Sequence, residues 1–200
     1  MTTCWLNQSF EENGKYKMAI FADRDGTLIK HIDYLCDPKL VELHPRVKES
    51  VQKILKAGIH FFLFSNQSGV SRGYFDENTV NQCNQAMFEL LEITKEDLSG
   101  ICIATGLPGS NDLYRKPSPR FINEALKYFK IESSNAHIIG DTMVDLEAGN
   151  AAEINAWLVG NGKKETVLAH ETKSIDLKYK FCKDFSSCID SILFNNPIFR

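Results

Sequence analysis

The sequence lacks any pronounced excess of charge of one sign. Lysine and arginine together number 23, against 26 aspartates and glutamates, so the formal net charge is −3. A general basic field, which would attract nucleic acid or an acidic membrane surface, is therefore absent. We expect no membrane partner, and binding of nucleic acid would require a local basic groove.

Long apolar runs are also missing. No stretch approaches the ~20 apolar residues that a helix needs to cross a bilayer. Residues 1–17, MTTCWLNQSFEENGKYK, lack the apolar segment of a secretory signal. These absences predict a cytoplasmic protein.

The six cysteines lack any metal-binding pattern. There is no C-x-x-C pair, and no cysteine and histidine spacing is typical of a zinc site. Four of them lie in or beside apolar segments, namely Cys36, Cys83, Cys102 and Cys182. We expect most of the cysteines to be small buried hydrophobes in a reducing compartment.

Short apolar runs, by contrast, recur along the chain. Its 200 residues, 43% of them hydrophobic and 24% charged, suit one globular domain. The runs are nearly continuous, as in strands that are buried on both faces of a parallel sheet. They are Met18–Ala22, Ile59–Phe64, Ile101–Ala104, Ala136–Ile139, Ala156–Val159 and, more weakly, Lys178–Phe181.

The segments between these runs carry apolar residues at helical spacing. Capping residues and prolines predict helices that begin near Pro45, Asp76, Ser118 and Thr142, with a fifth helix over residues 186–193. Alternating strands and helices imply right-handed crossovers. The predicted fold is therefore a three-layer α/β sandwich of the Rossmann type, with a mostly parallel central sheet.

The domain organisation is simple. The sequence contains no internal repeat, low-complexity tract or linker. The first sixteen residues are mostly polar. We predict that residues 1–16 form an arm over the surface, and that residues 17–200 form one domain.

Four polar clusters follow the predicted strands. The carboxyl ends of parallel strands share one edge of a sheet, and ligands bind outside that edge. We therefore expect the clusters to meet. They are Asp23-Arg24-Asp25-Gly26-Thr27, Ser65-Asn66-Gln67-Ser68-Gly69, Arg115-Lys116-Pro117 and Gly140-Asp141-Thr142-Met143-Val144-Asp145.

The residue types in these clusters indicate phosphoryl chemistry. Converging carboxylates without cysteine or histidine suit a hard cation such as Mg²⁺. A lysine, a hydroxyl and glycine-flanked backbone N–H groups can hold phosphoryl oxygens. One carboxylate beside the metal could act as the nucleophile, and another could carry protons.

The ordered set resembles the four motifs of the haloacid dehalogenase (HAD) superfamily. The segments Phe21–Ile29, Ser65–Phe75 and Arg115–Pro117 narrow the resemblance to one branch of it. That branch contains heptose bisphosphate phosphatase and the histidinol-phosphate phosphatase domain. The resemblance covers roughly residues 18 to 160 and implies a phosphatase.

The resemblance implies four catalytic residues. Asp23 would attack phosphorus and form an aspartyl phosphate. Asp25 would protonate the leaving alkoxide and then deprotonate the water that hydrolyses the intermediate. Ser65 and Lys116 would bind the phosphoryl oxygens.

The resemblance also implies a Mg²⁺ site. Asp23, the backbone carbonyl of Asp25 and Asp141 would hold the ion. Asp145 would either be a further ligand or orient Lys116. The metal would act as a Lewis acid and as a template for the substrate.

HAD enzymes insert cap domains at two places, and both are short here. Leu28–His44 and Gly106–Tyr114 cannot hold a folded cap, so we predict a capless and open site. Loop side chains would then bind the substrate. The predicted substrate-binding residues are Thr27, Asn66, Arg72 and Arg115, with Lys30, His31 and Arg46 as further candidates because a second anionic group would favour cations.

One departure from the branch concerns zinc. Members of this phosphatase branch often carry a zinc-binding loop of cysteines and a histidine just before Arg-Lys-Pro. Residues 105–114 of this sequence contain neither residue type. We infer no structural zinc and a different substrate loop. The predicted substrate is D-glycero-D-manno-heptose 1,7-bisphosphate or a similar sugar phosphate, with histidinol phosphate and a polynucleotide 3′-phosphate as alternatives.

A different class of function remains open. A signalling module could use a long-lived aspartyl phosphate with the same metal, hydroxyl and lysine. Asp25 distinguishes a hydrolase from such a signalling module. A hydrolase needs an acid/base two residues after the nucleophile, and this chain has one. The prediction is an enzyme acting on a small phosphate ester, as a monomer or a weak homo-oligomer.

Overall fold

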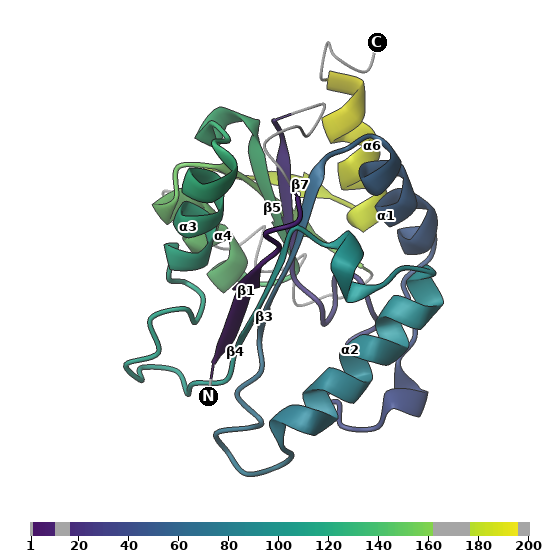
Figure 1. The fold of residues 1–200 in the computed structure, drawn as a ribbon, viewed down its shortest axis with the longest axis vertical. Coiled ribbons are helices and arrows are strands. Elements are labelled where there is room, and N and C mark those ends of the chain that lie inside the picture. Colours follow the sequence, from purple (N-terminus) through teal and green to yellow (C-terminus); the bar gives the residue numbers. More distant parts are fainter. Residues whose placement is uncertain (1, 11–16, 162–176, 196–200) are drawn as a thin grey trace.

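A sheet of seven strands runs through the computed structural model, which describes residues 2–10, 17–161 and 177–195 (Figure 1). The strand order is β1-β4-β3-β2-β5-β6-β7. Each neighbouring pair is parallel except β1 and β4. The strands are β1 (Thr3–Leu6), β2 (Ala19–Ala22), β3 (His60–Asn66), β4 (Gly100–Ala104), β5 (Ala136–Gly140), β6 (Asn155–Val159) and β7 (Lys180–Cys182).

Continuous apolar strands lie at the centre of this sheet because both faces are covered. All four residues of β2 are buried. Since side chains alternate along a strand, Ile20 and Ala22 pack into one apolar cluster, and Ala19 and Phe21 into the other. The predicted mostly parallel sheet is confirmed, and the weakest predicted strand lies slightly later, at Lys180–Cys182.

Helices form the two outer layers. One face carries α1 (Val47–Lys56), α2 (Glu77–Leu91) and α6 (Phe185–Asn195), and the other carries α3 (Arg120–Phe129) and α4 (Met143–Ala151) (Figure 1). The 3-10 helices Pro38–Leu40, Lys95–Asp97 and Ser133–Asn135 lie in the connections. The predicted three-layer sandwich is confirmed.

Local capping explains where the helices begin. Asp76 caps α2, because its side chain accepts a hydrogen bond from the Thr79 backbone N–H. Thr142 caps α4 through a capping box with Asp145. The third helix begins at Arg120, slightly later than the predicted cap at Ser118.

The N-terminal segment differs from its prediction. Within the predicted arm, β1 joins the edge of the sheet, where it pairs antiparallel with β4. Cys4 lies opposite Cys102 in this pairing, and the two form a disulfide, whereas we expected a reduced thiol at Cys102. Cys36 is exposed rather than buried. Residues 11–16 of the arm lie outside the described residues.

The two places where a cap domain could be inserted hold only short connections. Residues 28–44 contain one 3-10 helix and isolated bridges, and residues 106–114 form turns; the structure describes both segments in full. The predicted capless fold is confirmed. Among the described helices, none combines the length and the apolarity that a bilayer crossing needs.

Candidate active site

The carboxyl ends of β2, β3 and β5 bring the predicted clusters together. Ala22 pairs with Leu63 on one side and with Ile139 on the other, so β2 and β5 end within one residue of each other, and β3 continues to Asn66. The backbone N–H of Asp23 continues this ladder by donating to the Ile139 carbonyl at 3.0 Å. Asp23, Ser65 and Asp141 therefore lie at one edge of the sheet.

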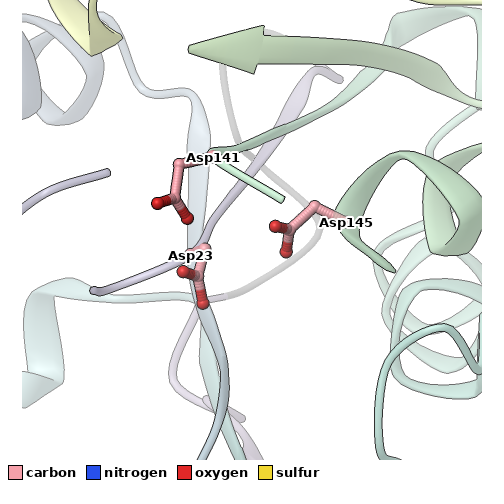
Figure 2. A group of neighbouring side chains, drawn as sticks. All are labelled: Asp23, Asp141 and Asp145. Carbon is pink, nitrogen blue, oxygen red and sulfur yellow. The ribbon is translucent and has the colours of Figure 1, made fainter. Parts of the chain in front are cut away.

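Three carboxylates converge at this edge. Asp23, Asp141 and Asp145 each place a carboxylate oxygen within 4.8 Å of the others. Figure 2 shows the three side chains around one region, with Asp145 reaching it from the start of α4. All three residues are buried, so their negative charges are not screened by solvent.

Lys116 lies among these carboxylates. Its Nζ donates to Asp23 Oδ1 at 2.7 Å, to Asp145 Oδ1 at 2.5 Å and to the carbonyl of Phe64 at 2.7 Å. Burial lowers the pKa of Lys116, but Asp145 and Asp23 outweigh it, so the net pKa is raised. The lysine is therefore a fixed cation at neutral pH.

The pKa of Asp23 is strongly perturbed. Burial raises it, Lys116 lowers it, and the carboxylates of Asp145, Asp141 and Asp25 raise it again, to about 7. Ionised Asp23 therefore lies in a site with more negative than positive charge.

The donor set fits a hard divalent cation. Among the described residues, this cluster offers carboxylate oxygens without sulfur or nitrogen ligands. Mg²⁺ prefers such ligands, and its charge would offset the repulsion that raises the pKa of Asp23. Each of the three aspartates offers one carboxylate oxygen to such an ion, and Lys116 Nζ donates to one oxygen of Asp23 and to one oxygen of Asp145.

Asp145 is fixed by the local backbone. Its Oδ2 accepts hydrogen bonds from Thr142 Oγ1 at 2.5 Å and from the Thr142 backbone N–H at 3.2 Å. Gly140 makes room for it, because a Cβ at that position would lie 2.2 Å from Asp145 Cγ. Asp145 was predicted either to bind the metal or to orient Lys116. Its hydrogen bonds to Lys116 and Thr142 occupy both carboxylate oxygens and favour the second role.

Asp25 lies beside the three-carboxylate cluster and is held by other residues. Arg24, which is only 1% exposed, donates from Nε and Nη2 to its carboxylate, both at 3.1 Å. Gln67 Nε2 donates to Asp25 Oδ2 at 2.7 Å and to Ser65 Oγ at 2.9 Å. The Asp25 carboxylate is therefore fixed in place, while the metal-binding role of its backbone carbonyl stays a prediction.

Arg24, Gln67 and Asn84 had no predicted role, but their side chains support Asp25. Arg24 Nη1 donates to Asn84 Oδ1 at 2.8 Å, and Asn84 lines a cavity of about 380 Å³ between α2 and the β1–β4 edge. The run of Asp, Arg and Asp at positions 23–25 was the one available signal, because an arginine between two acidic residues favours an ion pair. Its partner on α2 could not be inferred from the sequence.

Asn66 holds the backbone of Lys116. Its Oδ1 accepts from the Lys116 backbone N–H and its Nδ2 donates to the Lys116 carbonyl, both at 3.0 Å. Both polar atoms of the Asn66 carboxamide are thus occupied by the backbone of Lys116. A direct contact between Asn66 and the substrate stays a prediction.

A cavity of about 240 Å³ adjoins Asp25. It is lined by His31, Tyr34, Asn66 and Phe75, among other residues. Asp25 forms part of its wall. This cavity is the candidate substrate pocket.

The three predicted arginines have different surroundings, and none of them lines this pocket. Arg72 lies 6.0 Å from the centre of the Tyr34 ring, and Arg115 donates to the Gly106 carbonyl. Arg46 forms ion pairs with Asp184 and Asp190 at α6.

Two further candidates for substrate binding, Thr27 and Lys30, belong to or closely follow the Asp23–Thr27 cluster in the sequence. Lys30 is exposed and pairs with the exposed Glu42. Thr27 is fully buried, and its Oγ1 has no hydrogen-bond partner among the described residues. Its role in substrate binding stays a prediction.

The comparisons with known proteins agree with this architecture. A family model described as HAD-hydrolase-like matches residues 113–187. The fold is that of the D,D-heptose 1,7-bisphosphate phosphatase of B. bronchiseptica, solved with magnesium and phosphate: the TM-score is 0.77 at 24% identity, covering 90% of this chain and 99% of that one. The fold and the matches define a HAD-type phosphatase.

Two curated relatives narrow the class. The D-glycero-beta-D-manno-heptose-1,7-bisphosphate 7-phosphatase of Mesorhizobium japonicum is 34% identical over 150 residues, 70% of this chain and 69% of the relative. The enzyme of the same name from Pasteurella multocida is 33% identical over 157 residues, 75% of this chain and 85% of the relative. The chain belongs to the heptose-1,7-bisphosphate 7-phosphatase family of HAD-type phosphatases.

Proposed function

We propose that this protein is a Mg²⁺-dependent phosphomonoester hydrolase that acts through an aspartyl phosphate on Asp23. The observation that carries the proposal is the cluster of Asp23, Asp141 and Asp145 within 4.8 Å, with the Lys116 ammonium between Asp23 and Asp145. A carboxylate nucleophile, a fixed cation and a site for a divalent ion are what phosphoryl transfer requires.

The reaction has two steps at the residues of this chain. An oxygen of Asp23 attacks phosphorus, and the ester oxygen leaves with a proton from Asp25. Asp25 then takes a proton from water, and that water attacks the phosphorus of the intermediate and releases phosphate. Asp23, Asp141 and the Asp25 carbonyl would hold Mg²⁺, which would supply charge neutralisation and alignment when bound.

The remaining contacts serve these two steps. Lys116 and Ser65 would bind phosphoryl oxygens, and Asn66 and Asp145 hold Lys116 in place. Arg24 and Gln67 fix the orientation of Asp25, which must face both the leaving oxygen and the attacking water.

The substrate we propose is D-glycero-D-manno-heptose 1,7-bisphosphate or a similar sugar bisphosphate. The support is the similarity to relatives of that name and the cavity beside Asp25. Arg72 and Arg115 would contact the second anionic group. We place the protein in the cytoplasm as a monomer or a weak homo-oligomer, acting on a small phosphate ester without nucleic acid.

A panel of substrates tests this proposal. Phosphate release is measured with Mg²⁺ from heptose bisphosphate, other sugar bisphosphates and monophosphates, histidinol phosphate and a 3′-phosphorylated oligonucleotide. We expect kcat/KM above about 10⁴ M⁻¹s⁻¹ for a sugar bisphosphate, within the usual enzyme range, and no release with excess EDTA. A phosphoenzyme that persists for hours in Mg²⁺ would instead indicate a signalling module.

The role of Asp25 gives a second prediction. In Asp25→Ala the leaving oxygen receives no proton, so kcat/KM for an alkyl phosphate should fall about 10²–10⁴-fold, the range of general acid catalysis. p-Nitrophenolate leaves without a proton, so kcat/KM for p-nitrophenyl phosphate should fall far less. An equal loss for both substrates would contradict the acid role.

A further inference from the structure

Asp112 is the centre of the loop that joins β4 to Lys116. Its Oδ2 accepts from the Gly106 backbone N–H at 2.9 Å, and its Oδ1 accepts from the Tyr114 backbone N–H at 3.0 Å. Thr2 Oγ1 also donates to Asp112 Oδ2. Burial raises the pKa of Asp112, but these hydrogen bonds lower it more, so the carboxylate stays ionised at neutral pH.

Gly106 links Asp112 to Arg115 by two backbone hydrogen bonds. Its N–H is held by Asp112, and its carbonyl accepts from Arg115 Nη1 at 3.0 Å. Only a glycine fits, because a Cβ there would lie 2.5 Å from Asp112 Cβ and 2.7 Å from Ser110 Oγ. The guanidinium of Arg115 is therefore linked to the Asp112 carboxylate through one residue, Gly106, whose N–H binds Asp112 and whose carbonyl binds Arg115.

The N-terminal strand closes the same loop from the other side. Thr2 directly precedes β1, and its Oγ1 accepts from the Thr105 backbone N–H at 3.1 Å while it donates to Asp112. The hydroxyl thus bridges the end of β4 to the carboxylate that organises the loop. β1 itself is anchored by its pairing with β4.

Arg115 and Arg72 share one neighbourhood. Burial lowers the pKa of Arg115, the charge of Arg72 lowers it further, and Asp112 opposes both. Arg72 lies 6.0 Å from the centre of the Tyr34 ring, and Tyr34 lines the candidate substrate pocket together with Asn66, which holds the backbone of Lys116. Guanidinium groups beside that pocket suit an anionic group of the substrate. Arg115 also directly precedes Lys116, whose ammonium faces the nucleophile.

We infer that Thr2 and Asp112 are positioning residues that fix Arg115 for the second anionic group of the substrate. The N-terminal strand is then part of the specificity apparatus and not a surface arm. This inference rests on the proposed function, because it needs a substrate with an anionic group beyond the one that is hydrolysed.

Matched variants of Thr2 test the inference. Thr2→Val keeps the shape and removes the hydroxyl, whereas Thr2→Ser keeps the hydroxyl. For heptose 1,7-bisphosphate we expect Thr2→Val to raise KM roughly tenfold, as for one lost hydrogen bond to a charged group, with kcat unchanged. For p-nitrophenyl phosphate, which has no second anionic group, KM should be unchanged, and Thr2→Ser should match the unaltered protein with both substrates.

Asp112→Asn gives a second and independent measurement. The amide cannot accept at both positions, so hydrogen exchange at the Gly106 and Tyr114 backbone amides should accelerate, while amides of β5 exchange as before. The same variant should raise KM for the bisphosphate selectively, as Thr2→Val does. Asp112→Glu is not a suitable control, because the longer side chain would crowd Gly106.

The outcomes separate the inference from the proposed function. An equal rise of KM for both substrates, or unchanged KM with accelerated exchange, would overturn the positioning role. No turnover of any bisphosphate by the unaltered protein would overturn the proposed substrate class. Hydrogen exchange tests the loop contacts of Asp112 even if no bisphosphate is hydrolysed. Unchanged exchange at the Gly106 and Tyr114 amides in Asp112→Asn would overturn these contacts, and accelerated exchange would support them.

Discussion

Replacing Asp23 by asparagine is expected to abolish turnover while the fold is kept. The neutral amide cannot attack phosphorus, so kcat should fall by about 10⁴-fold or more, as when the nucleophile of another hydrolase is removed. The amide oxygen can still accept the hydrogen bond from Lys116 Nζ, which preserves the local geometry. The measurement is phosphate release with Mg²⁺, together with thermal unfolding.

Unfolding provides the control for this variant. In the unaltered protein the pKa of Asp23 is raised from 3.8 to about 7, so ionising it in the metal-free fold costs stability as the pH rises from about 4 to 7. The neutral amide of Asp23→Asn has no such cost, and we expect the variant in EDTA to be at least as stable at pH 8. The stabilisation by Mg²⁺ should shrink, because one ligand is weakened.

A wild-type rate in Asp23→Asn would end the mechanism proposed here. Loss of activity with loss of fold would leave the chemistry undecided, so the unfolding curve must accompany the rate. Asp141→Asn is a useful comparison. It should raise the Mg²⁺ concentration required for activity, whereas Asp23→Asn should stay inactive at every Mg²⁺ concentration.

The central strands and the meeting of the polar clusters could be predicted from the sequence. β2 and β5 are short continuous apolar runs, and such runs form strands when both faces of a sheet are covered. Because parallel strands end at one edge, the position of Asp23 and Asp141 after these runs was sufficient to bring them together.

The N-terminal strand could not be predicted in this way. β1 is a partly exposed edge strand, and Cys4 pairs with a residue 98 positions away. A four-residue segment with mixed exposure carries no periodic signal of its own. Its pairing is decided by β4, which offers a free edge, and so depends on the tertiary structure.

The hydrogen bonds that support the site residues could not be predicted from the sequence either. Arg24 is buried and bonded to Asn84, and Asn66 bonds to the backbone of Lys116, fifty positions away. These choices depend on side-chain direction and on the packing of α2. The ion pairs of Arg46 with Asp184 and Asp190 at α6 could not be inferred from the sequence either, because about 140 residues separate the partners.

Replacing Lys116 by methionine is expected to cost both activity and stability. Lys116 is 2% exposed and is bonded to two buried carboxylates, so its loss leaves Asp23 and Asp145 without their cation. Breaking a buried ion pair by removing one partner costs about 3–5 kcal/mol. We expect a loss of this size in the free energy of unfolding at pH 8 in EDTA, measured with urea.

The pH dependence of this loss has a definite sign. Without Lys116, which lowers the pKa of Asp23, that pKa should rise above its present value of about 7. A carboxyl whose folded pKa is raised destabilises the fold as the pH climbs from its unfolded pKa to the folded one. The deficit of Lys116→Met should therefore be smaller at pH 5 than at pH 8, and Mg²⁺ should reduce it at pH 8.

A double variant isolates the charge effect from the loss of packing. Lys116→Met combined with Asp145→Asn removes the cation and one of its two carboxylate partners, so less negative charge stays buried. If the buried charges dominate, the double variant should be less destabilised than the sum of the two single variants, as expected for residues in direct contact. Additive losses that are equal at pH 5 and pH 8 would show that Lys116 contributes packing alone, and the electrostatic account of this site would then be wrong.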